Sequence, residues 1–278
     1  MNAIGSTLRR AQDRLATDNA RLEADVLLAH VLQCERSFLY AQSDVRLNDS
    51  DACQFEGYVQ RRAAGEPLAY ITKQREFWSL TLEVNHHTLI PRPDTETLVS
   101  HALELCTSKN ARTLELGTGS GAIALALAFE KPLWKIDAVD VVPEAVLLAQ
   151  RNQAALAIQN VCAYHSDWFA SVRPEQFELI LSNPPYIDSH DPHLTMGDVA
   201  FEPRTALVAA NNGLADIFLI IEQAVLFLAP NAWLLLEHGF EQGGAVRAFM
   251  LEKNYVDVHT VSDLAGLPRV TAGRFPSE

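Results

Sequence analysis

The pattern of apolar and polar positions divides this chain of 278 residues into a helical beginning and a longer part in which strands and helices alternate. Near the start, apolar side chains recur at helical spacing, which predicts one face of an amphipathic helix. The positions on this face are Leu22, Val26, Ala29 and Leu32. A second helix is expected to begin at Asp49 or Ser50, either of them a good N-cap, and to end at Gly65. The pattern therefore predicts a small helical domain over residues 1–67, for recognition or packing rather than catalysis.

The pattern changes after this helical part, where apolar and polar positions alternate with a period of two. Polar residues separate Leu80, Leu82 and Val84, as in a half-buried strand. Residues 68–90 are therefore expected to form a β-ribbon that links the helical domain to the rest of the chain. A helix should then begin within Pro91–Glu96, because prolines and acidic side chains are favoured in a first helical turn.

Strand-like and helical segments alternate over most of residues 91–278. The expected strands are 112–116, 135–141, 161–166, 177–182 and 232–237. The expected helices are 122–129, 143–156 and 214–228. This alternation is typical of an α/β domain with a mostly parallel sheet that helices cover on both faces. At the end, 255–261 and 270–275 are strand-like without a clear helix between them, so we expect an antiparallel edge at the C-terminus.

The first of these strands leads into a glycine-rich loop that consists of Gly117, Thr118, Gly119, Ser120 and Gly121. Glycines there accept unusual φ angles and let a ligand approach the backbone closely. With Ala122, the loop also satisfies the pattern of dinucleotide-binding proteins, so a nicotinamide cofactor and S-adenosylmethionine both fit it. Glu115 favours S-adenosylmethionine, because a carboxylate suits its cationic amino-acid end and offers nothing to a pyrophosphate.

Two later strand ends carry side chains that suit a nucleoside. Asp140 lies at the end of the second expected strand, where a carboxylate can accept hydrogen bonds from both hydroxyls of a ribose. Asp167 and Trp168 follow the third strand, where a carboxylate can accept from the exocyclic amine of adenine and an indole can stack on the base. A tryptophan that merely closes the sheet edge is the alternative, but the position one strand after Asp140 favours the cofactor.

The fourth strand runs into Asn183, Pro184, Pro185 and Tyr186. The two prolines fix the backbone and offer only carbonyl acceptors. The Asn183 amide supplies an acceptor and two donors beside the flat ring of Tyr186. This arrangement predicts a rigid holder for a planar group that bears an NH₂, although a stiff turn would use the same residue types. The glycine-rich loop upstream favours the holder.

Composition narrows the range of partners. The net charge of −13 argues against a protein that binds by coating nucleic-acid phosphates. The four cysteines are widely spaced, so neither a disulfide framework nor a zinc site is expected. His190 and His193 are separated by Pro192 and have no evident third ligand, and we predict no metal. Since no apolar signal core and no stretch of membrane length is present, a cytoplasmic protein without a membrane partner is expected.

With these motifs in order, the chain resembles the peptide chain release factor glutamine methyltransferases. The resemblance covers Leu68 to Phe275, and the helical beginning fits the layout of that family. It rests on four signatures, which are the glycine-rich loop and the segments 90–96, 183–188 and 201–203. The tetrapeptide Asn-Pro-Pro-Tyr alone is less specific, because adenine-amino DNA methyltransferases and some RNA guanine methyltransferases share it.

The resemblance implies a Rossmann-like class I methyltransferase fold over residues 91–278. It also implies an enzyme that methylates the side-chain nitrogen of the glutamine in a Gly-Gly-Gln motif, converting S-adenosylmethionine to S-adenosylhomocysteine. The glycine-rich loop would line the methionine part of the cofactor, Asp140 would hold the ribose, and Trp168 would lie by the adenine. Glu115 stands where the family often has Asp, so the charge is kept.

The same resemblance implies roles for the tetrapeptide. Asn183 would bond the substrate amide with help from the Pro184 carbonyl, while Tyr186 packs on the amide plane and Pro185 completes the substrate-binding set. Asn183 would border the cofactor as well. Release factors would be the protein partners of a chain that is otherwise monomeric and holds no stable nucleic acid. The alternatives are a nucleic-acid amino methyltransferase with the same pocket, a nicotinamide-dependent oxidoreductase and a non-catalytic cofactor-binding adaptor.

Overall fold

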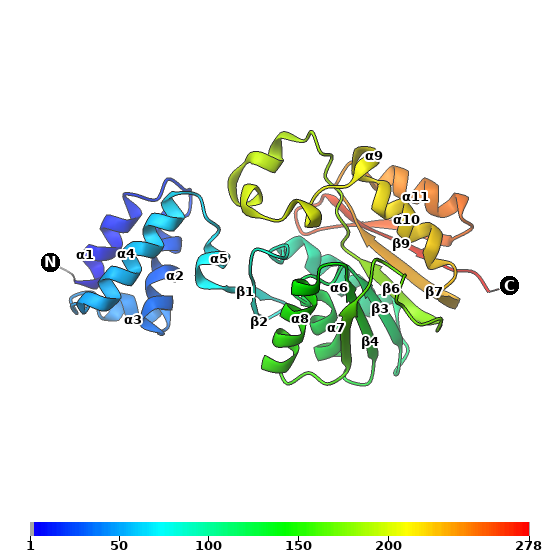
Figure 1. The fold of residues 1–278 in the computed structure, drawn as a ribbon, viewed down its shortest axis with the longest axis horizontal. Coiled ribbons are helices and arrows are strands. Elements are labelled where there is room, and N and C mark those ends of the chain that lie inside the picture. Colours follow the sequence, from blue (N-terminus) through cyan, green and yellow to red (C-terminus); the bar gives the residue numbers. More distant parts are fainter. Residues whose placement is uncertain (1–2, 278) are drawn as a thin grey trace. The chain divides into compact units, whose positions relative to one another are not determined.

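The computed structural model describes residues 3–277, which form two compact units. The first unit consists of Met1–Gln74 and Thr195–Phe201, and the second consists of Arg75–Leu194 and Glu202–Glu278. Figure 1 shows that the first unit is built mainly from helices, whereas the second contains the main sheet. The short segment Thr195–Phe201 therefore belongs to the helical unit although both of its flanks belong to the sheet unit.

The helical unit has a core of its own, formed where its helices pack together. Its helices are α1 (Ile4–Gln12), α2 (Ala20–Leu32), α3 (Arg36–Ala41), α4 (Asp49–Ala63) and α5 (Leu68–Thr72). The helix expected from residue 21 is present as α2, but the predicted buried face is wrong in part. Leu22 is exposed, while Ala24, Leu27 and Leu28 are fully buried. The reason is that α2 is apolar on several sides and packs against both α1 and α4, so spacing alone did not select the face.

Two local predictions in this part of the chain are corrected. The N-cap of α4 is Asn48 rather than Asp49 or Ser50, because its side-chain oxygen accepts a hydrogen bond of 2.8 Å from the backbone N–H of Asp51. Residues 68–72, expected within a β-ribbon, form helix α5 instead. Ile71 is buried in the helical core, so packing outweighed the local strand-like composition. The domain boundaries at residues 67 and 90 stay predictions.

A hairpin of two short strands, β1 (Gln74–Phe77) and β2 (Leu80–Glu83), precedes the main sheet. The seven strands of the sheet lie in the order β5-β4-β3-β6-β7-β9-β8. Their bounds are β3 Arg112–Leu116, β4 Lys135–Asp140, β5 Val161–His165, β6 Phe177–Ser182, β7 Leu228–Glu237, β8 Val256–Ser262 and β9 Pro268–Arg274. All pairings from β5 to β7 are parallel, and β9 runs antiparallel to both β7 and β8. The predicted α/β class with an antiparallel C-terminal edge is confirmed.

Helices cover both faces of this sheet. On one face lie α6 (Glu96–Leu105), α7 (Ala122–Glu130) and α8 (Pro143–Ala155), and on the other lie α10 (Ala215–Ala224) and α11 (Gly243–Glu252). The chain also forms the short helix α9 (Ala210–Gly213) and 3₁₀ turns at Pro93–Thr95, Pro192–Thr195, Gly197–Phe201 and Arg204–Ala206. Helix α10 ends before the predicted residue 228, because the Phe227 carbonyl already accepts a hydrogen bond of 2.7 Å from the N–H of Phe177 at the sheet.

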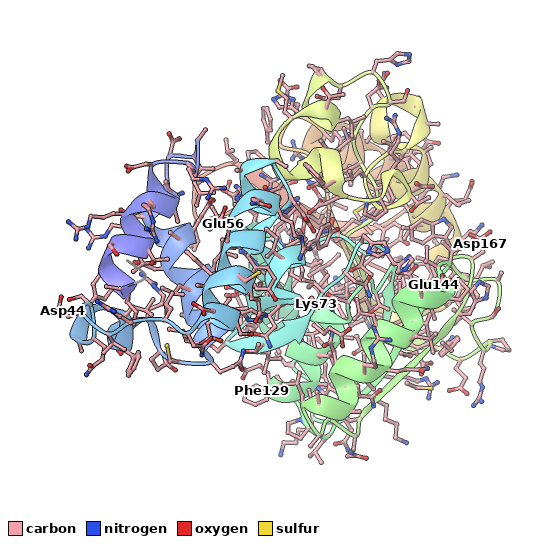
Figure 2. All side chains as sticks on the ribbon, turned by 60° about the vertical axis from the view of Figure 1, so that its left-hand side comes forward. Asp44, Glu56, Lys73, Phe129, Glu144 and Asp167 are labelled. Carbon is pink, nitrogen blue, oxygen red and sulfur yellow. The ribbon has the colours of Figure 1, made fainter. Side chains whose placement is uncertain are left out.

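The outer surface of the sheet unit carries charged side chains, among them Glu144 on α8 and Asp167 after β5 (Figure 2). None of the helices within residues 3–277 has the length and apolar content that a membrane span requires.

Candidate functional site

The topology of the sheet gathers the predicted site residues at one edge. Strands β3 to β7 run parallel, so their carboxyl ends point the same way. Strand β3 is the first of these strands in the sequence. The next two strands, β4 and β5, lie on one side of it in the sheet, and β6 and β7 lie on the other side. Such a switch point leaves a crevice where α/β proteins bind ligands. A cavity of about 410 Å³ lies there.

Most of the predicted cofactor and substrate residues line this cavity. They are Glu115, Gly117, Thr118, Gly119, Ser120, Asp140, Asp167, Trp168, Asn183 and Pro185. Three predicted residues are not part of the lining. Gly121 is the N-cap of α7 with φ +84°, and a Cβ there would lie 3.2 Å from the Cβ of Ala149, so this glycine permits close packing of α7 on α8. Pro184 and Tyr186 are not among the residues that line the cavity, and the Pro184 side chain is buried.

Glu115 is the fully buried carboxyl group at the base of the glycine-rich loop. Its Oε2 accepts hydrogen bonds from the Thr118 hydroxyl at 2.6 Å and from the Ala124 N–H at 3.1 Å. Its Oε1 has no hydrogen-bond partner among the residues that the structure describes. Burial raises the pKa of Glu115 to about 8. A buried carboxyl with one unused oxygen fits the ammonium group of an amino acid, whose positive charge would favour the ionised form.

Asp140 ties the glycine-rich loop to the end of β4. Its Oδ2 accepts a hydrogen bond of 2.8 Å from the Gly119 N–H, and its Oδ1 accepts one of 2.9 Å from the Val142 N–H. Burial raises the pKa of this carboxyl as well. Each oxygen keeps a second lone pair, so the backbone bonds leave Asp140 able to accept from ribose hydroxyls at the cavity.

The far end of the cavity is aromatic and acidic. Trp168 adopts a left-handed conformation with φ 44°, and the Ser166 hydroxyl donates to its carbonyl at 2.7 Å. Gly117 beside it has φ +73°, a conformation that favours glycine, and a Cβ there would lie at an ordinary contact distance of 3.7 Å from the indole ring. Asp216 from α10 also lines the cavity, and its pKa is raised by burial and then by the charge of Asp167.

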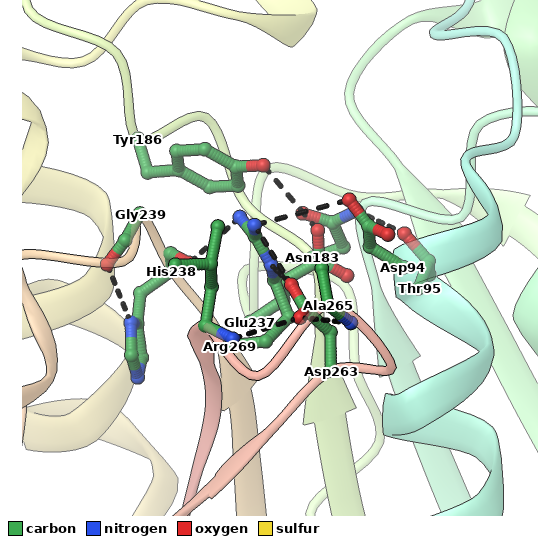
Figure 3. Close-up of polar contacts among 11 residues, drawn as sticks. Asp94, Thr95, Asn183, Tyr186, Glu237, His238, Gly239, Asp263, Ala265 and Arg269 are labelled. Atoms are coloured by element: carbon green, nitrogen blue, oxygen red, sulfur yellow. Dashed lines mark hydrogen bonds and ion pairs between the residues drawn. The ribbon is translucent and has the colours of Figure 1, made fainter.

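The carboxyl end of β6 holds the tetrapeptide in a network of polar side chains (Figure 3). The Asn183 Nδ2 donates to the Thr95 Oγ1 at 3.2 Å, and the Tyr186 hydroxyl donates to the Glu237 Oε1 at 3.3 Å. Burial and then the charge of Glu237 keep the pKa of Tyr186 well above its usual range. The tyrosine is therefore a neutral hydrogen-bond donor rather than an acid.

Several residues of the site were missed by sequence reasoning. They are Phe77, His87, Thr88, Leu89, Pro91, Arg92, Thr95, Ile123, Val141, Val142, Ser166, Thr205, Ala206, Val208 and Asp216, all of which line the cavity. The segment 90–96 was interpreted as the start of a helix and as a family signature, and the second signal could have placed Arg92 and Thr95 in the site. His87 also lines the cavity. Nothing in the sequence indicated Asp216.

Two further motifs are now placed. The Arg92 guanidinium donates to the Glu202 Oε2 at 2.7 Å, and the Glu202 side chain is fully buried. His190 and His193 are exposed and contact Asp188 and Asp191 in their own turns, at 3.0 and 2.7 Å. Within the part of the chain that the structure describes, no three His, Cys, Asp or Glu side chains are grouped to hold a metal ion.

Comparisons with known proteins agree with this geometry. The PrmC N-terminal domain family matches residues 6–72, and the methyltransferase small domain family matches residues 93–208. Among solved structures, a methyltransferase from Pyrococcus furiosus shares the fold with a TM-score of 0.54 at 18% identity, covering 70% of this chain and 90% of that chain.

Two relatives cover nearly the whole chain. A release factor glutamine methyltransferase from Salmonella typhimurium is 52% identical over 259 residues, which is 93% of this chain and 94% of the relative. One from Escherichia coli is 51% identical over 269 residues, which is 96% of this chain and 97% of the relative. Half of the residues are thus identical over almost the full length, and the chain belongs to the release factor glutamine methyltransferase family.

Proposed function

We propose that this chain methylates the side-chain amide nitrogen of the glutamine in the Gly-Gly-Gln motif of peptide chain release factors, with S-adenosylmethionine as methyl donor. One observation carries the proposal: Asn183 and Pro185 border the same cavity as the glycine-rich loop and Asp140. A methyl donor and an acceptor amide held there would be neighbours. The names of the relatives supply the acceptor.

The residues around the cavity fit the donor. The glycine-rich loop, Glu115 and Asp140 would hold its amino-acid part and ribose, and Asp167 and Trp168 would hold its adenine. The Oε1 of Glu115 supports this assignment, because it is a buried hydrogen-bond acceptor to which no described residue donates, and buried acceptors usually have a donor. When bound, S-adenosylmethionine supplies a methyl group on a sulfonium, which is already a good leaving group.

The residues of the tetrapeptide prepare the acceptor. A carboxamide nitrogen is a poor nucleophile, because its lone pair is delocalised into the carbonyl. The Asn183 Oδ1 and the Pro184 carbonyl would each accept one N–H of the substrate amide, which raises electron density on the nitrogen and fixes its direction. Pro185 and Tyr186 would keep the amide plane in place. Fixing a near-attack geometry can supply up to about 7–11 kcal/mol. Because the sulfonium already carries a good leaving group, a strong general base is not needed, and the amide nitrogen loses one proton after the methyl group has been transferred.

The proposed substrate also indicates the cellular location of the enzyme and its protein partner. Release factors act in translation, so we place the enzyme in the cytoplasm, with the release factor as its protein partner. We propose a monomer outside the substrate complex and no stable nucleic-acid partner, in line with the net charge of −13.

The test is the methylated product. A purified release factor is incubated with the enzyme and S-adenosylmethionine, and mass spectrometry of the Gly-Gly-Gln peptide should find one methyl group on the glutamine. Asn183→Ala should lose most of this transfer while calorimetry finds cofactor affinity nearly unchanged, because Asn183 acts mainly on the acceptor. Transfer of labelled methyl to DNA or RNA and not to the release factor would refute the proposal, as would an Asn183→Ala enzyme with full turnover.

A further inference from the structure

Arg92 is a cationic residue at the cavity. Among the residues that the structure describes, it is the only lysine or arginine in the cavity lining. The acidic residues of the lining are Glu115, Asp140, Asp167 and Asp216. The Arg92 Nη2 donates to the Glu202 Oε2 at 2.7 Å, and the Glu202 side chain is fully buried, whereas the Arg92 side chain is 30% exposed. A buried carboxylate therefore holds a guanidinium that remains accessible.

The backbone around Arg92 is rigid. Pro91 and Pro93 flank this residue, and a residue that precedes a proline is driven to an extended conformation. Arg92 has that conformation, with φ −98° and ψ 143°. The Pro91 carbonyl accepts a hydrogen bond of 3.1 Å from the Arg75 Nε, and the Arg92 carbonyl accepts one of 3.1 Å from the Thr95 N–H. The arginine is therefore fixed at both ends, by its backbone and by the buried carboxylate.

Both partners of this ion pair are joined to the tetrapeptide. The turn that starts directly after the arginine carries Thr95, whose Oγ1 accepts a hydrogen bond of 3.2 Å from the Asn183 Nδ2. Glu202 leads into the segment that ends at Val208, which lines the cavity. Val208 forms a β-bridge with Ile187, the residue directly after the tetrapeptide. These two connections place the ion pair on the acceptor side of the cavity.

The chemistry of a guanidinium limits what it can bind. It carries only donors, and the bond to Glu202 is the one hydrogen bond that the Arg92 side chain makes to the described residues. Its other N–H groups are therefore left for an acceptor. Because Glu202 compensates the positive charge, a sulfonium cation in the cavity is repelled little and a phosphate is attracted little. A neutral carbonyl oxygen is the acceptor that suits this group.

A Gly-Gly-Gln segment offers two kinds of carbonyl, that of the glutamine side chain and those of the main chain. A guanidinium on the side-chain carbonyl would draw electron density from the amide nitrogen, which has to act as the nucleophile. A bond to a main-chain carbonyl has no such cost. The two glycines favour it, because a backbone without side chains can approach another group closely.

We propose that Arg92 binds a main-chain carbonyl of the Gly-Gly-Gln segment and that Glu202 is the positioning residue for its guanidinium. The bond fixes the backbone from which the glutamine side chain reaches Asn183. This inference rests on the proposed function, because it names a substrate contact of that reaction.

The experiment measures the affinity of a release factor for the enzyme loaded with S-adenosylhomocysteine, which has no methyl group to transfer. Glu202→Gln serves as the background, because the glutamine oxygen still accepts from the guanidinium and no buried charge is left unpaired when the arginine is removed. Adding Arg92→Met to this background should raise the dissociation constant of the release factor about tenfold or more, the value of a hydrogen bond to a charged group. In turnover, KM should rise by a similar factor, while kcat and the affinity for S-adenosylmethionine stay unchanged.

A second release factor, in which alanine replaces the glutamine of the motif, separates the two kinds of carbonyl. If the contact is to the main chain, loss of Arg92 should weaken binding of both release factors by the same factor. An effect that vanishes with the alanine release factor would assign Arg92 to the side-chain carbonyl and overturn the inference. Arg151→Met removes an exposed guanidinium that pairs with Glu83 at 3.0 Å outside the cavity lining, and this control should bind as the wild type does.

Unchanged affinity for the release factor after loss of Arg92 would also overturn the inference while leaving the proposed function intact. If the double variant does not fold, as judged by circular dichroism, Arg92→Lys decides, since lysine keeps the charge beside Glu202 but lacks the planar fork of donors. Its dissociation constant for both release factors should rise, and a wild-type value would count against the contact. A wild-type enzyme that leaves the glutamine unmethylated would instead refute the proposed function, and the inference with it.

Discussion

Glu115→Gln tests the energetic cost of the buried carboxyl at the glycine-rich loop. The pKa of Glu115 is raised from 4.5 to about 8 by burial. At about 1.4 kcal/mol per pKa unit, the ionised group destabilises the cofactor-free fold by roughly 5 kcal/mol. Because the folded state binds this proton more tightly than the unfolded state, the contribution of Glu115 to stability is complete below pH 4.5 and is lost as the pH rises through about 8.

The assay compares the free energy of unfolding of the wild type and the variant by urea titration at about pH 5 and about pH 8. The wild type should lose roughly 3 kcal/mol more than Glu115→Gln between these two conditions. Glu237, with a pKa of about 7, titrates in both proteins and cancels from the difference. Glu241→Gln makes the same chemical change at an exposed position and should follow the wild type. Equal pH dependence in wild type and Glu115→Gln would refute the argument.

The protonation of Glu115 also provides a test of where the amino group of the cofactor binds. A bound ammonium group would favour the ionised form of Glu115, so binding near neutral pH should release a proton. Calorimetry of S-adenosylmethionine binding in two buffers of different ionisation enthalpy measures that proton. Its release should be absent in Glu115→Gln, and a wild type that releases no proton would contradict the placement of the amino group beside Glu115.

Two other substitutions test the scaffold of the site. Asp140→Ala should mainly weaken S-adenosylmethionine binding, because it removes both the ribose acceptor and the bond to the Gly119 N–H; an unaltered dissociation constant by calorimetry would argue against this role. Gly213→Ala should lower turnover and cost about 1–3 kcal/mol of stability, because at φ +80° its Cβ would lie 2.0 Å from the Tyr186 carbonyl oxygen. Gly244→Ala, where a Cβ meets nothing within 4 Å, is the matched control and should keep wild-type turnover.

The strands of the sheet unit were predictable because their signals are local. The segment 112–116 leads into the glycine-rich loop, the mostly apolar run 177–182 precedes Asn183 and the proline pair, and both strands have the predicted bounds. The buried face of α2 and the helix α5 were not predictable in this way, because packing against other helices decided them. Local sequence carries no information about which neighbours a segment will meet.

The same distinction applies to the site. Glu115 and Asn183 were found because each lies at a strand end beside a glycine or proline signal, and Asp140 because it is an acidic residue at the end of the next strand. Thr95 and Asp216 reach the cavity from a turn and a helix distant in sequence. The family resemblance predicted that Tyr186 packs on the plane of the substrate amide. The structure adds that its hydroxyl group donates a hydrogen bond to the Glu237 carboxyl, which no sequence signal indicated.

The position of Glu237 follows from strand register rather than from any motif. In the parallel pair of β6 and β7, Ser182 lies opposite Leu236, so Asn183 and Glu237 are the next residues on neighbouring strands. In the antiparallel pair of β7 and β9, Glu237 lies opposite Val270, which places Arg269 one residue away. A shift of one residue in either register would turn Glu237 to the other face of the sheet or separate it from its countercharge. The pairing of three strands therefore places Glu237 beside the tetrapeptide and near its countercharge, and the tetrapeptide alone does not determine this position.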